Sequence, residues 1–262
     1  MKIVVFTNNS IRHKFIANSL SKASDESLII SECNPNELNS LDSESPTLID
    51  EHFKLRYETE QKFFSNNNYF ETNTLPIMYK EASLPSTFEA IKKFNPDMMF
   101  VFGASILKGP ILSLMPQGRF INLHLGLSPY YRGSGTNFWP FVNKELEYVG
   151  STILHLDEGI DTGDIICHVR PLIEHADNVH SIGCKVIQES VKKLIEIMDF
   201  VDSGGTLNRV KQWEIPNPKY YRRRDFNEEI LKTYYANLNN GLIEHHIQNT
   251  KNPLKLIKNI HG

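Results

Sequence analysis

The chain has 262 residues, of which 40% are hydrophobic, so it can bury one large domain or a main domain with a small appendage and is not a disordered tail. Its formal net charge of −3 and pI of about 6.4 give no general attraction to DNA or RNA, and we expect no nucleic-acid partner. The three cysteines, Cys33, Cys167 and Cys184, form no C-x-x-C pair, which argues against a disulfide framework or a thiolate metal site and favours a reducing compartment.

The first predicted elements are a strand, a helix and a second strand. Lys2–Phe6 is an apolar, β-forming run that is too short for a secretory leader. Thr7–Ser10 supplies turn and capping residues, and apolar residues then recur at helical spacing from Ile11 to Leu20. Leu28–Ser31 is predicted to be the second strand, and the polar stretch Glu32–Ser45 a surface loop.

Two helices and two buried strands are predicted next. Leu48–Phe64 carries apolar residues at helical spacing, and Pro85–Phe94 has proline in its first turn. Asp97–Gly103 and Arg119–Asn122 are short apolar runs typical of neighbouring buried strands. This alternation favours an α/β fold with a Rossmann-like, mostly parallel sheet and a cleft at the carboxyl ends of its strands.

The second half of the chain continues the sheet and adds a long helix. Strands are predicted over Val149–Leu156 and Asp164–Val169, and a helix with one apolar face over Val179–Val201. Because Gly204 and Gly205 end that helix, we expect a catalytic domain over residues 1–203 and a small C-terminal extension over 204–262, with a strand or loop and one or two short helices. No run approaches the ~18 apolar residues of a membrane span, so we expect a soluble, cytoplasmic protein with no membrane partner.

One group of residues carries the candidate chemistry. Asn122 and His124 are two apart on a predicted strand and therefore project from the same face. Asp161 follows the next predicted strand and supplies a carboxylate. Taken singly, such an asparagine is usually a turn or cap residue and such a histidine a hydrogen-bonded structural group. An amide, an imidazole and a carboxylate within reach of one another, however, can perform acyl transfer.

The order of these motifs resembles that of the N10-formyltetrahydrofolate-dependent formyltransferases, which include glycinamide ribonucleotide, methionyl-tRNA and nucleotide-sugar N-formyltransferases. The resemblance is strong over Asp97–Arg170 and weaker back to Met1, and it combines Asn122-Leu123-His124, Pro129, Arg132-Gly133, Gly150-Ser151-Thr152 and Asp157-Glu158-Gly159-Ile160-Asp161-Thr162-Gly163. The chain has Gly126-Leu127-Ser128-Pro129 where many members have Ser-Leu-Leu-Pro. The shared proline predicts the same turn. The different residue at position 126, Gly126, means that the resemblance does not predict how the amine substrate is bound.

The resemblance implies a catalytic role for three residues. The Asn122 amide would donate to the formyl oxygen as its negative charge grows, an interaction typically worth ~3–4 kcal/mol. His124 would donate to the same oxygen as imidazolium and move a proton between the attacking amine and the departing N10, for which a pKa near neutrality suits an imidazole. Asp161 would hold the imidazole, favour its charged form and help to take the proton that the amine loses. Asp157 is the competing carboxylate, but the catalytic acid of the family precedes the Thr-Gly pair, which selects Asp161.

The resemblance also implies where the formyl donor, N10-formyltetrahydrofolate, would bind. The pocket would be formed by the segment before the Asn-x-His strand and by the loop that carries Asp161. Ile106 and Leu107 would be apolar walls and Gly103 would let the backbone approach the ring, with ordinary core packing as the alternative. The candidate donor-binding residues are Phe102, Gly103, Ala104, Ile106, Leu107, Leu156, Asp157, Gly159 and Ile160.

Two further groups of residues are candidates for binding the amine substrate. Asn8, Asn9 and Arg12 lie at the first strand–helix junction, where a helix N-terminus could bind phosphate. Gly126, Tyr130 and Arg132 follow the Asn-x-His strand and are candidate acceptor contacts, with a structural turn as the alternative. The run Arg222-Arg223-Arg224 beside Tyr220 and Tyr221 could meet a phosphate but is more often a solvated surface. His245-His246 has no further ligand at metal-binding spacing, so no metal is predicted.

A sugar-nucleotide acceptor fits the extension best, as in the synthesis of a surface polysaccharide. Methionyl-tRNA enzymes usually carry a larger, basic C-terminal β-domain, and glycinamide ribonucleotide enzymes usually stop soon after the core. Formyltetrahydrofolate hydrolases of this fold usually carry an N-terminal regulatory domain, whereas the first strand predicted here begins at Lys2. A nucleotide-binding scaffold would be favoured if the catalytic residues were displaced. Many sugar-modifying members pair through their C-terminal parts, so a homodimer is a further expectation.

Overall fold

A seven-stranded sheet forms the centre of the protein. The computed structural model describes residues 1–33, 46–249 and 254–262, and the sheet has the order β3-β2-β1-β4-β5-β7-β8. Pairing is parallel from β3 to β5 and antiparallel between β5 and β7 and between β7 and β8. The predicted α/β fold with a mostly parallel sheet is therefore confirmed. The strands are β1 (Lys2–Asn8), β2 (Glu26–Cys33), β3 (Thr74–Met78), β4 (Met98–Val101), β5 (Phe120–His124), β7 (Ser151–His155) and β8 (Ile165–Val169).

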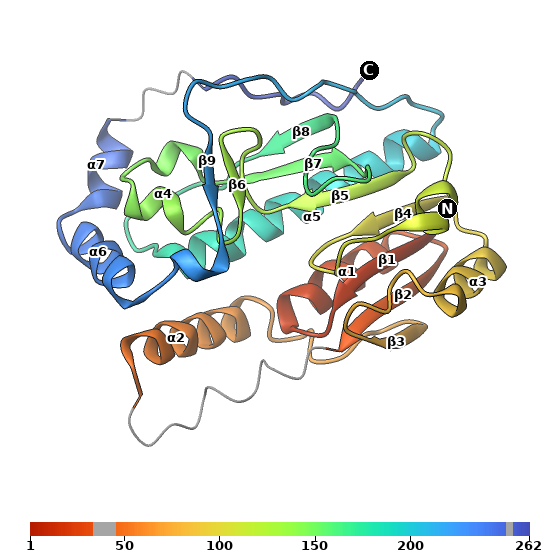
Figure 1. Cartoon of the computed structure of the whole chain (residues 1–262), viewed down its shortest axis with the longest axis horizontal. Helices are drawn as coiled ribbons and strands as arrows, with labels where there is room; N and C mark the ends of the chain where they lie inside the picture. Colours follow the sequence, from red (N-terminus) through yellow and green to blue (C-terminus); the bar gives the residue numbers. More distant parts are fainter. Residues whose placement is uncertain (34–45, 250–253) are drawn as a thin grey trace.

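Helices cover both faces of the sheet (Figure 1). Ile3 and Val5 of β1 pack with α1 and α5 in one core cluster, whereas Val4 and Phe6 pack with α3 in another. This alternation follows from the two-residue period of a strand, and coverage of both faces explains why the strands read as continuous apolar runs. The helices are α1 (Ile11–Lys22), α2 (Leu48–Phe63), α3 (Pro85–Phe94), α4 (Trp139–Val142), α5 (Val179–Asp202), α6 (Glu228–Asn239) and α7 (Leu242–Gln248).

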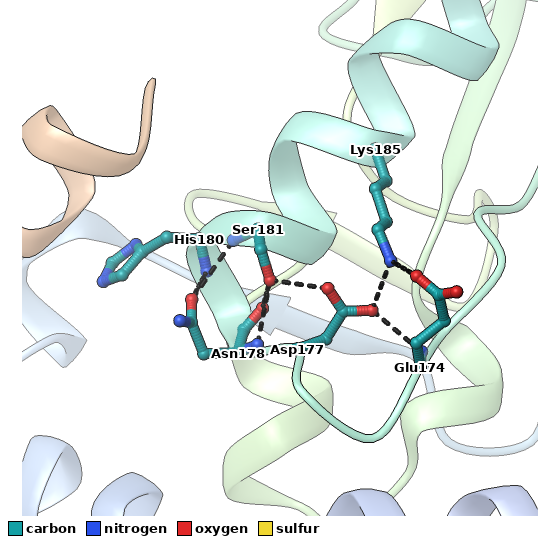
Figure 2. Close-up of polar contacts among 6 residues, drawn as sticks. All are labelled: Glu174, Asp177, Asn178, His180, Ser181 and Lys185. Atoms are coloured by element: carbon teal, nitrogen blue, oxygen red, sulfur yellow. Dashed lines mark hydrogen bonds and ion pairs between the residues drawn. The ribbon is translucent and has the colours of Figure 1, made fainter. Parts of the chain in front are cut away.

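The N-terminus of α5 is fixed by a network of polar side chains (Figure 2). Asn178 accepts hydrogen bonds from the backbone N–H groups of His180 and Ser181, which caps the helix. The Asp177 carboxylate accepts from Ser181 Oγ at 2.8 Å and from Lys185 Nζ at 2.7 Å. These contacts set the start of the long helix within one residue of the predicted position.

Most predicted boundaries agree with the structure, and the exceptions are the end of β2 and the edge strand β3. The helices predicted over 48–64, 85–94 and 179–201 are confirmed to within one residue. The strand β2 continues past the predicted end, because Glu32 and Cys33 pair with β3. The rest of the predicted loop, residues 34–45, lies outside the described residues. Edge strand β3 was not predicted, since Pro76 interrupts its pattern.

The described part of residues 204–262 packs against two separate parts of the sheet domain. Strand β9 (Lys219–Tyr221) pairs in parallel with β6 (Tyr131–Gly133), which places Arg132 opposite Tyr220. Helix α6 packs on α4 through Tyr234, which lies against Phe138 and Phe141. The division at residue 203 stays a prediction. No helix in the described ranges is both long and apolar enough to cross a bilayer, and the cytoplasmic location also stays a prediction.

Candidate active site

A cleft opens where the central parallel strands end. Its volume is about 380 Å³, and its walls come from the β1–α1 junction, the segment after β4, the end of β5, the segment around β6 and the loop between β7 and β8. Ligand sites of open α/β sheets lie at this carboxyl edge, because the loops from several strands converge there. The cleft is therefore the candidate active site.

The structure brings Asn122, His124 and Asp161 together at this cleft. Asn122 and His124 occupy alternate positions of β5, and both line the cleft together with Asp161. Asn122 Nδ2 donates to Asp161 Oδ1 at 2.8 Å. His124 Nδ1 lies 3.1 Å from Asp161 Oδ2. One carboxylate thus contacts both the amide and the imidazole, each through a different oxygen.

The surroundings of Asp161 favour its ionised form. Burial of the carboxyl group opposes ionisation, but hydrogen bonds from His124 and Asn122 and the positive charge of Arg132 outweigh it and lower the pKa of Asp161. An ionised carboxylate only accepts hydrogen bonds, so His124 Nδ1 carries the proton in this contact. The opposite ring nitrogen, Nε2, is buried and has no hydrogen-bond partner in the described part of the chain.

Asp157 shapes the loop that carries Asp161. Its carboxylate accepts from the Gly159 N–H at 3.1 Å and from Thr162 Oγ1 at 2.9 Å. A Cβ atom at Gly159 would lie 1.9 Å from Thr162 Oγ1, so only glycine fits this tight turn. Asp157 lines the cleft as predicted, but its hydrogen bonds are made within the loop.

All nine predicted donor-binding residues line the cleft. Their side chains are largely apolar, and the isoleucines at positions 106 and 160 are 49% and 59% exposed. Apolar walls of this kind, beside the partnerless Nε2 of His124, fit a flat, partly apolar ligand that brings a hydrogen-bonding group. The nine are Phe102, Gly103, Ala104, Ile106, Leu107, Leu156, Asp157, Gly159 and Ile160.

The predicted substrate-binding residues are only partly at the cleft. Asn8 and Arg12 line it, whereas Asn9, Gly126, Tyr130 and Arg132 are not among its lining residues. Arg12 forms an ion pair with Glu60 at 2.9 Å, which partly neutralises the charge expected to bind phosphate. The Asn8 amide donates to the Gly103 carbonyl and its oxygen accepts from Ser10.

Tyr130 contacts the C-terminal tail and not the cleft. Its hydroxyl donates to the Lys255 carbonyl at 3.0 Å, and its ring packs against Trp213 and Tyr148. Arg224 and its two arginine neighbours are exposed beside β9. Among the described residues, no group of three or more His, Cys, Asp and Glu side chains is placed to hold a metal ion.

Gly126 lies directly against the candidate catalytic imidazole. A Cβ atom there would lie 2.7 Å from both His124 Nε2 and Thr136 Cβ. We expect Gly126→Ala to displace the imidazole and to lower kcat by about tenfold to a hundredfold, because displacements near 1 Å are costly in an active site. The measurement is steady-state kinetics of the reaction proposed below.

Gly183→Ala is the matched control for this substitution. Gly183 lies within α5, and a Cβ atom there would meet nothing within 4 Å, so kcat should not change. Equal kcat values for Gly126→Ala and the wild type would show that the contact with His124 does not matter.

Sequence reasoning missed two residues, one that lines the cleft and one that contacts the cleft-lining Ser105. His13 lines the cleft, stacks on Phe102 at 4.4 Å, and burial lowers its pKa to about 3 despite a hydrogen bond to the Phe102 carbonyl. A Cβ atom at Gly103 would lie 2.1 Å from the His13 ring, so the position of this ring leaves room only for glycine at residue 103. Glu32 is buried and accepts from Ser105 N–H at 2.8 Å and from its hydroxyl. His13 follows the predicted capping residues, whereas no local signal marks Glu32.

Comparisons with known proteins point to one family. Residues 1–198 match the family described as Formyl transferase. The methionyl-tRNA formyltransferase of Desulforamulus reducens is 36% identical over 130 residues, which cover 49% of this chain and 40% of that protein. The corresponding enzyme of Bacteroides thetaiotaomicron is 27% identical over 192 residues, covering 69% of this chain and 57% of that protein. The chain thus spans less than two thirds of the length of these curated relatives.

Solved structures share the fold. A 4-N formyltransferase from Francisella tularensis has a TM-score of 0.57 at 20% identity and covers 89% of this chain and 86% of its own. An N-formyltransferase from Helicobacter canadensis, in complex with folinic acid and dTDP-3-aminofucose, has a TM-score of 0.53 at 20% identity, with 86% and 72% covered. A phosphoribosylglycinamide formyltransferase from Anaplasma phagocytophilum has a TM-score of 0.56 at 13% identity, with 85% and 98% covered.

Proposed function

Because the chain belongs to the formyl transferase family, we propose that it transfers a formyl group from N10-formyltetrahydrofolate to the primary amine of an amino-sugar nucleotide. The observation that carries the proposal is the contact of one carboxylate, Asp161, with both Asn122 and His124 at the wall of one cleft. The Asn122 amide supplies a hydrogen-bond donor, and the His124 imidazole can carry a proton. The negative charge of Asp161 orients that imidazole. Each of these contributions lowers the barrier to acyl transfer to an amine.

The donor would occupy the part of the cleft lined by the segments after β4 and after β7. Ile106, Leu107 and Leu156 would pack against its ring system, and the buried Nε2 of His124 would meet its polar end. When bound, the folate supplies the formyl carbon attached to N10. The residues of the chain orient this group and exclude water from it.

Asn122 would stabilise the charge that develops on the formyl oxygen. A side-chain amide has two N–H groups, and in Asn122 one of them already donates to Asp161. The second is left for the formyl oxygen, and the first fixes the direction of the amide. A preorganised donor of this kind gains strength as the oxygen becomes negative.

His124 would move the proton between the two nitrogen atoms of the reaction. The amine nitrogen forms a bond to the formyl carbon and loses a proton, and the bond from that carbon to N10 breaks as N10 gains a proton. With Nδ1–H held by Asp161, Nε2 of the neutral imidazole can take the proton and then return it. The ionised carboxylate stabilises the imidazolium that exists between these two steps.

Charged and aromatic groups on β6, on β9 and directly after β9 support a nucleotide-linked acceptor, since Gly133 of β6 lines the cleft. The positive charge of Arg132 acts on Asp161. The β6–β9 pairing places Arg132 opposite the exposed Tyr220, and Arg222–Arg224 follow in the chain. Guanidinium groups suit phosphates and a tyrosine ring suits a base. The Helicobacter canadensis neighbour with dTDP-3-aminofucose shares the fold.

A panel of acceptors tests the proposal. Purified protein is incubated with N10-formyltetrahydrofolate and, separately, with dTDP-, UDP- and GDP-linked amino sugars, glycinamide ribonucleotide, methionyl-tRNA or no acceptor. We expect tetrahydrofolate and a formylated amino-sugar nucleotide, identified by mass spectrometry, and no product with Asn122→Ala. Formate release without an acceptor would indicate a hydrolase, and no consumption of the donor under any condition would reject formyl transfer.

Methionyl-tRNA is the second candidate acceptor. The curated relatives reported above are methionyl-tRNA formyltransferases, with up to 36% identity over 130 residues. Formylation of methionyl-tRNA, with none of the amino-sugar nucleotides turned over, would replace the sugar acceptor and retain the roles of the three catalytic residues.

A further inference from the structure

The segment after α5 runs along the outer edge of the sheet, beside the loop that carries Asp161 (Figure 1). Val210 and Ile165 pair through both backbone hydrogen bonds, at 2.7 and 3.0 Å. Arg209 forms an ion pair with Asp164 at 3.1 Å. The Asn208 carbonyl lies 2.8 Å from Nε2 of His155, the last residue of β7. This segment therefore contacts both ends of the β7–β8 connection.

Gln212 makes the contact nearest to the candidate catalytic carboxylate. Its Nε2 atom donates to the Asp161 carbonyl at 2.8 Å and to the Gly163 carbonyl at 3.0 Å. Both N–H groups of one amide are thus used, and they join the backbone on the two sides of Thr162. A side chain with a single N–H donor could not hold both carbonyls at once.

The backbone conformation at Asp161 requires stabilising contacts such as these hydrogen bonds. Its φ is +53°, a left-handed conformation that residues other than glycine adopt only at a cost in free energy. Strained backbone persists only where the surroundings determine it. Gln212 holds the backbone carbonyl of Asp161, whereas Asn122 and His124 contact its side-chain carboxylate. If the turn relaxed, the carboxylate would move away from both residues.

We propose that Gln212 is a positioning residue of the reaction: it fixes the backbone on both sides of Thr162 and so holds the Asp161 carboxylate against Asn122 and His124. The expected effect of Gln212 on kcat rests on the proposed formyl transfer. Its expected effect on the loop that carries Asp161 does not. This positioning role makes the C-terminal segment part of the catalytic apparatus, although Gln212 touches neither substrate nor the reacting atoms.

Two substitutions test the proposal in the full-length chain. Gln212→Glu keeps the size of the side chain but sets carboxylate oxygens against two carbonyl oxygens, and Gln212→Ala removes both donors. Gln117→Ala is the matched control, because Gln117 is exposed. Thermal unfolding identifies any variant that fails to fold, in which case the other variant provides the test.

The first readouts need no substrate. Hydrogen exchange measured by mass spectrometry should become faster in residues 157–165 of both variants and stay unchanged in the control. The NMR resonance of the His124 Nδ1–H, which donates to Asp161, should broaden or disappear. Unchanged exchange in this loop together with an unchanged Nδ1–H resonance would overturn the proposal, whether or not the chain is a formyltransferase.

The kinetic readout separates positioning from a general structural effect. We expect kcat of formyl transfer to fall by about tenfold or more, with KM for donor and acceptor changed by no more than about twofold, because Gln212 does not bind either. A wild-type kcat in both variants would overturn the proposal. Absence of formyl transfer by the wild type would reject the proposed function instead, and the substrate-free readouts would still decide the role of Gln212.

Discussion

Replacing Asp161 by asparagine should lower kcat of formyl transfer about 10²–10⁴-fold, the range expected when a proton-transfer system is disabled. Asp161 accepts from Asn122 through one oxygen and from His124 through the other. Asparagine has one acceptor oxygen, so its NH₂ group would oppose one of the two donors. Either the Asn122 amide turns away, or the imidazole of His124 carries its proton on Nε2 instead of Nδ1, because Nδ1 must then accept from the new NH₂ group. Steady-state kinetics with the best acceptor of the panel gives kcat, and thermal unfolding checks the fold.

Two further aspartates make this prediction specific. Asp199 is exposed on α5, so Asp199→Asn should keep the wild-type kcat. Asp157 accepts from Gly159 and Thr162 within the loop, so Asp157→Asn should lose less kcat than Asp161→Asn. If Asp161→Asn stayed within tenfold of the wild type, or if Asp157→Asn lost more, the carboxylate assigned to catalysis would be the wrong one.

Local sequence patterns predicted six of the seven strands of the main sheet and one side of the candidate site. Asn122 and His124 had to share a face because they are two residues apart on β5, and the parallel strands had to end at one cleft. The β4 and β7–β8 segments were placed at that cleft by resemblance to a family, and their nine residues do line it. Periodicity alone does not give the contact of Asp161 with β5, since it joins a strand to a loop that lies more than thirty residues further along the chain.

The elements that sequence reasoning missed depend on contacts between distant segments. Strand β6 forms only because β9 pairs with it, and neither has an apolar run of its own. Arg12 was expected to bind phosphate, but its partner Glu60 comes from α2. The role of Gln212 cannot be predicted from the sequence. The two carbonyls to which it donates belong to the β7–β8 loop, which precedes α5 in the chain, whereas Gln212 follows α5.

The free energy of unfolding should fall by several kcal/mol between pH 7 and pH 5, because several histidines are buried in the neutral form. Burial lowers the pKa of His13 and of His180 to about 3. The neighbouring His52 lowers the pKa of His180 further. Burial lowers the pKa of His52 itself to about 4. In the unfolded chain each has a pKa near 6.5. The stabilisation is complete above that value and is lost as the pH falls towards the folded pKa, because the unfolded state binds more protons.

The expected loss at pH 5 is about 2 kcal/mol for each of His13 and His180, since one pKa unit corresponds to about 1.4 kcal/mol. Urea unfolding at a series of pH values measures it. His180→Phe should make the pH dependence shallower, because the buried His180 ring lies 4.4 Å from the ring of His52, and its Nε2 has no hydrogen-bond partner in the described part of the chain. The exposed His175 provides the control, and His175→Gln should keep the wild-type slope. Equal stability at pH 7 and pH 5, or an unchanged slope in His180→Phe, would mean that these histidines are protonated or solvated in the folded protein.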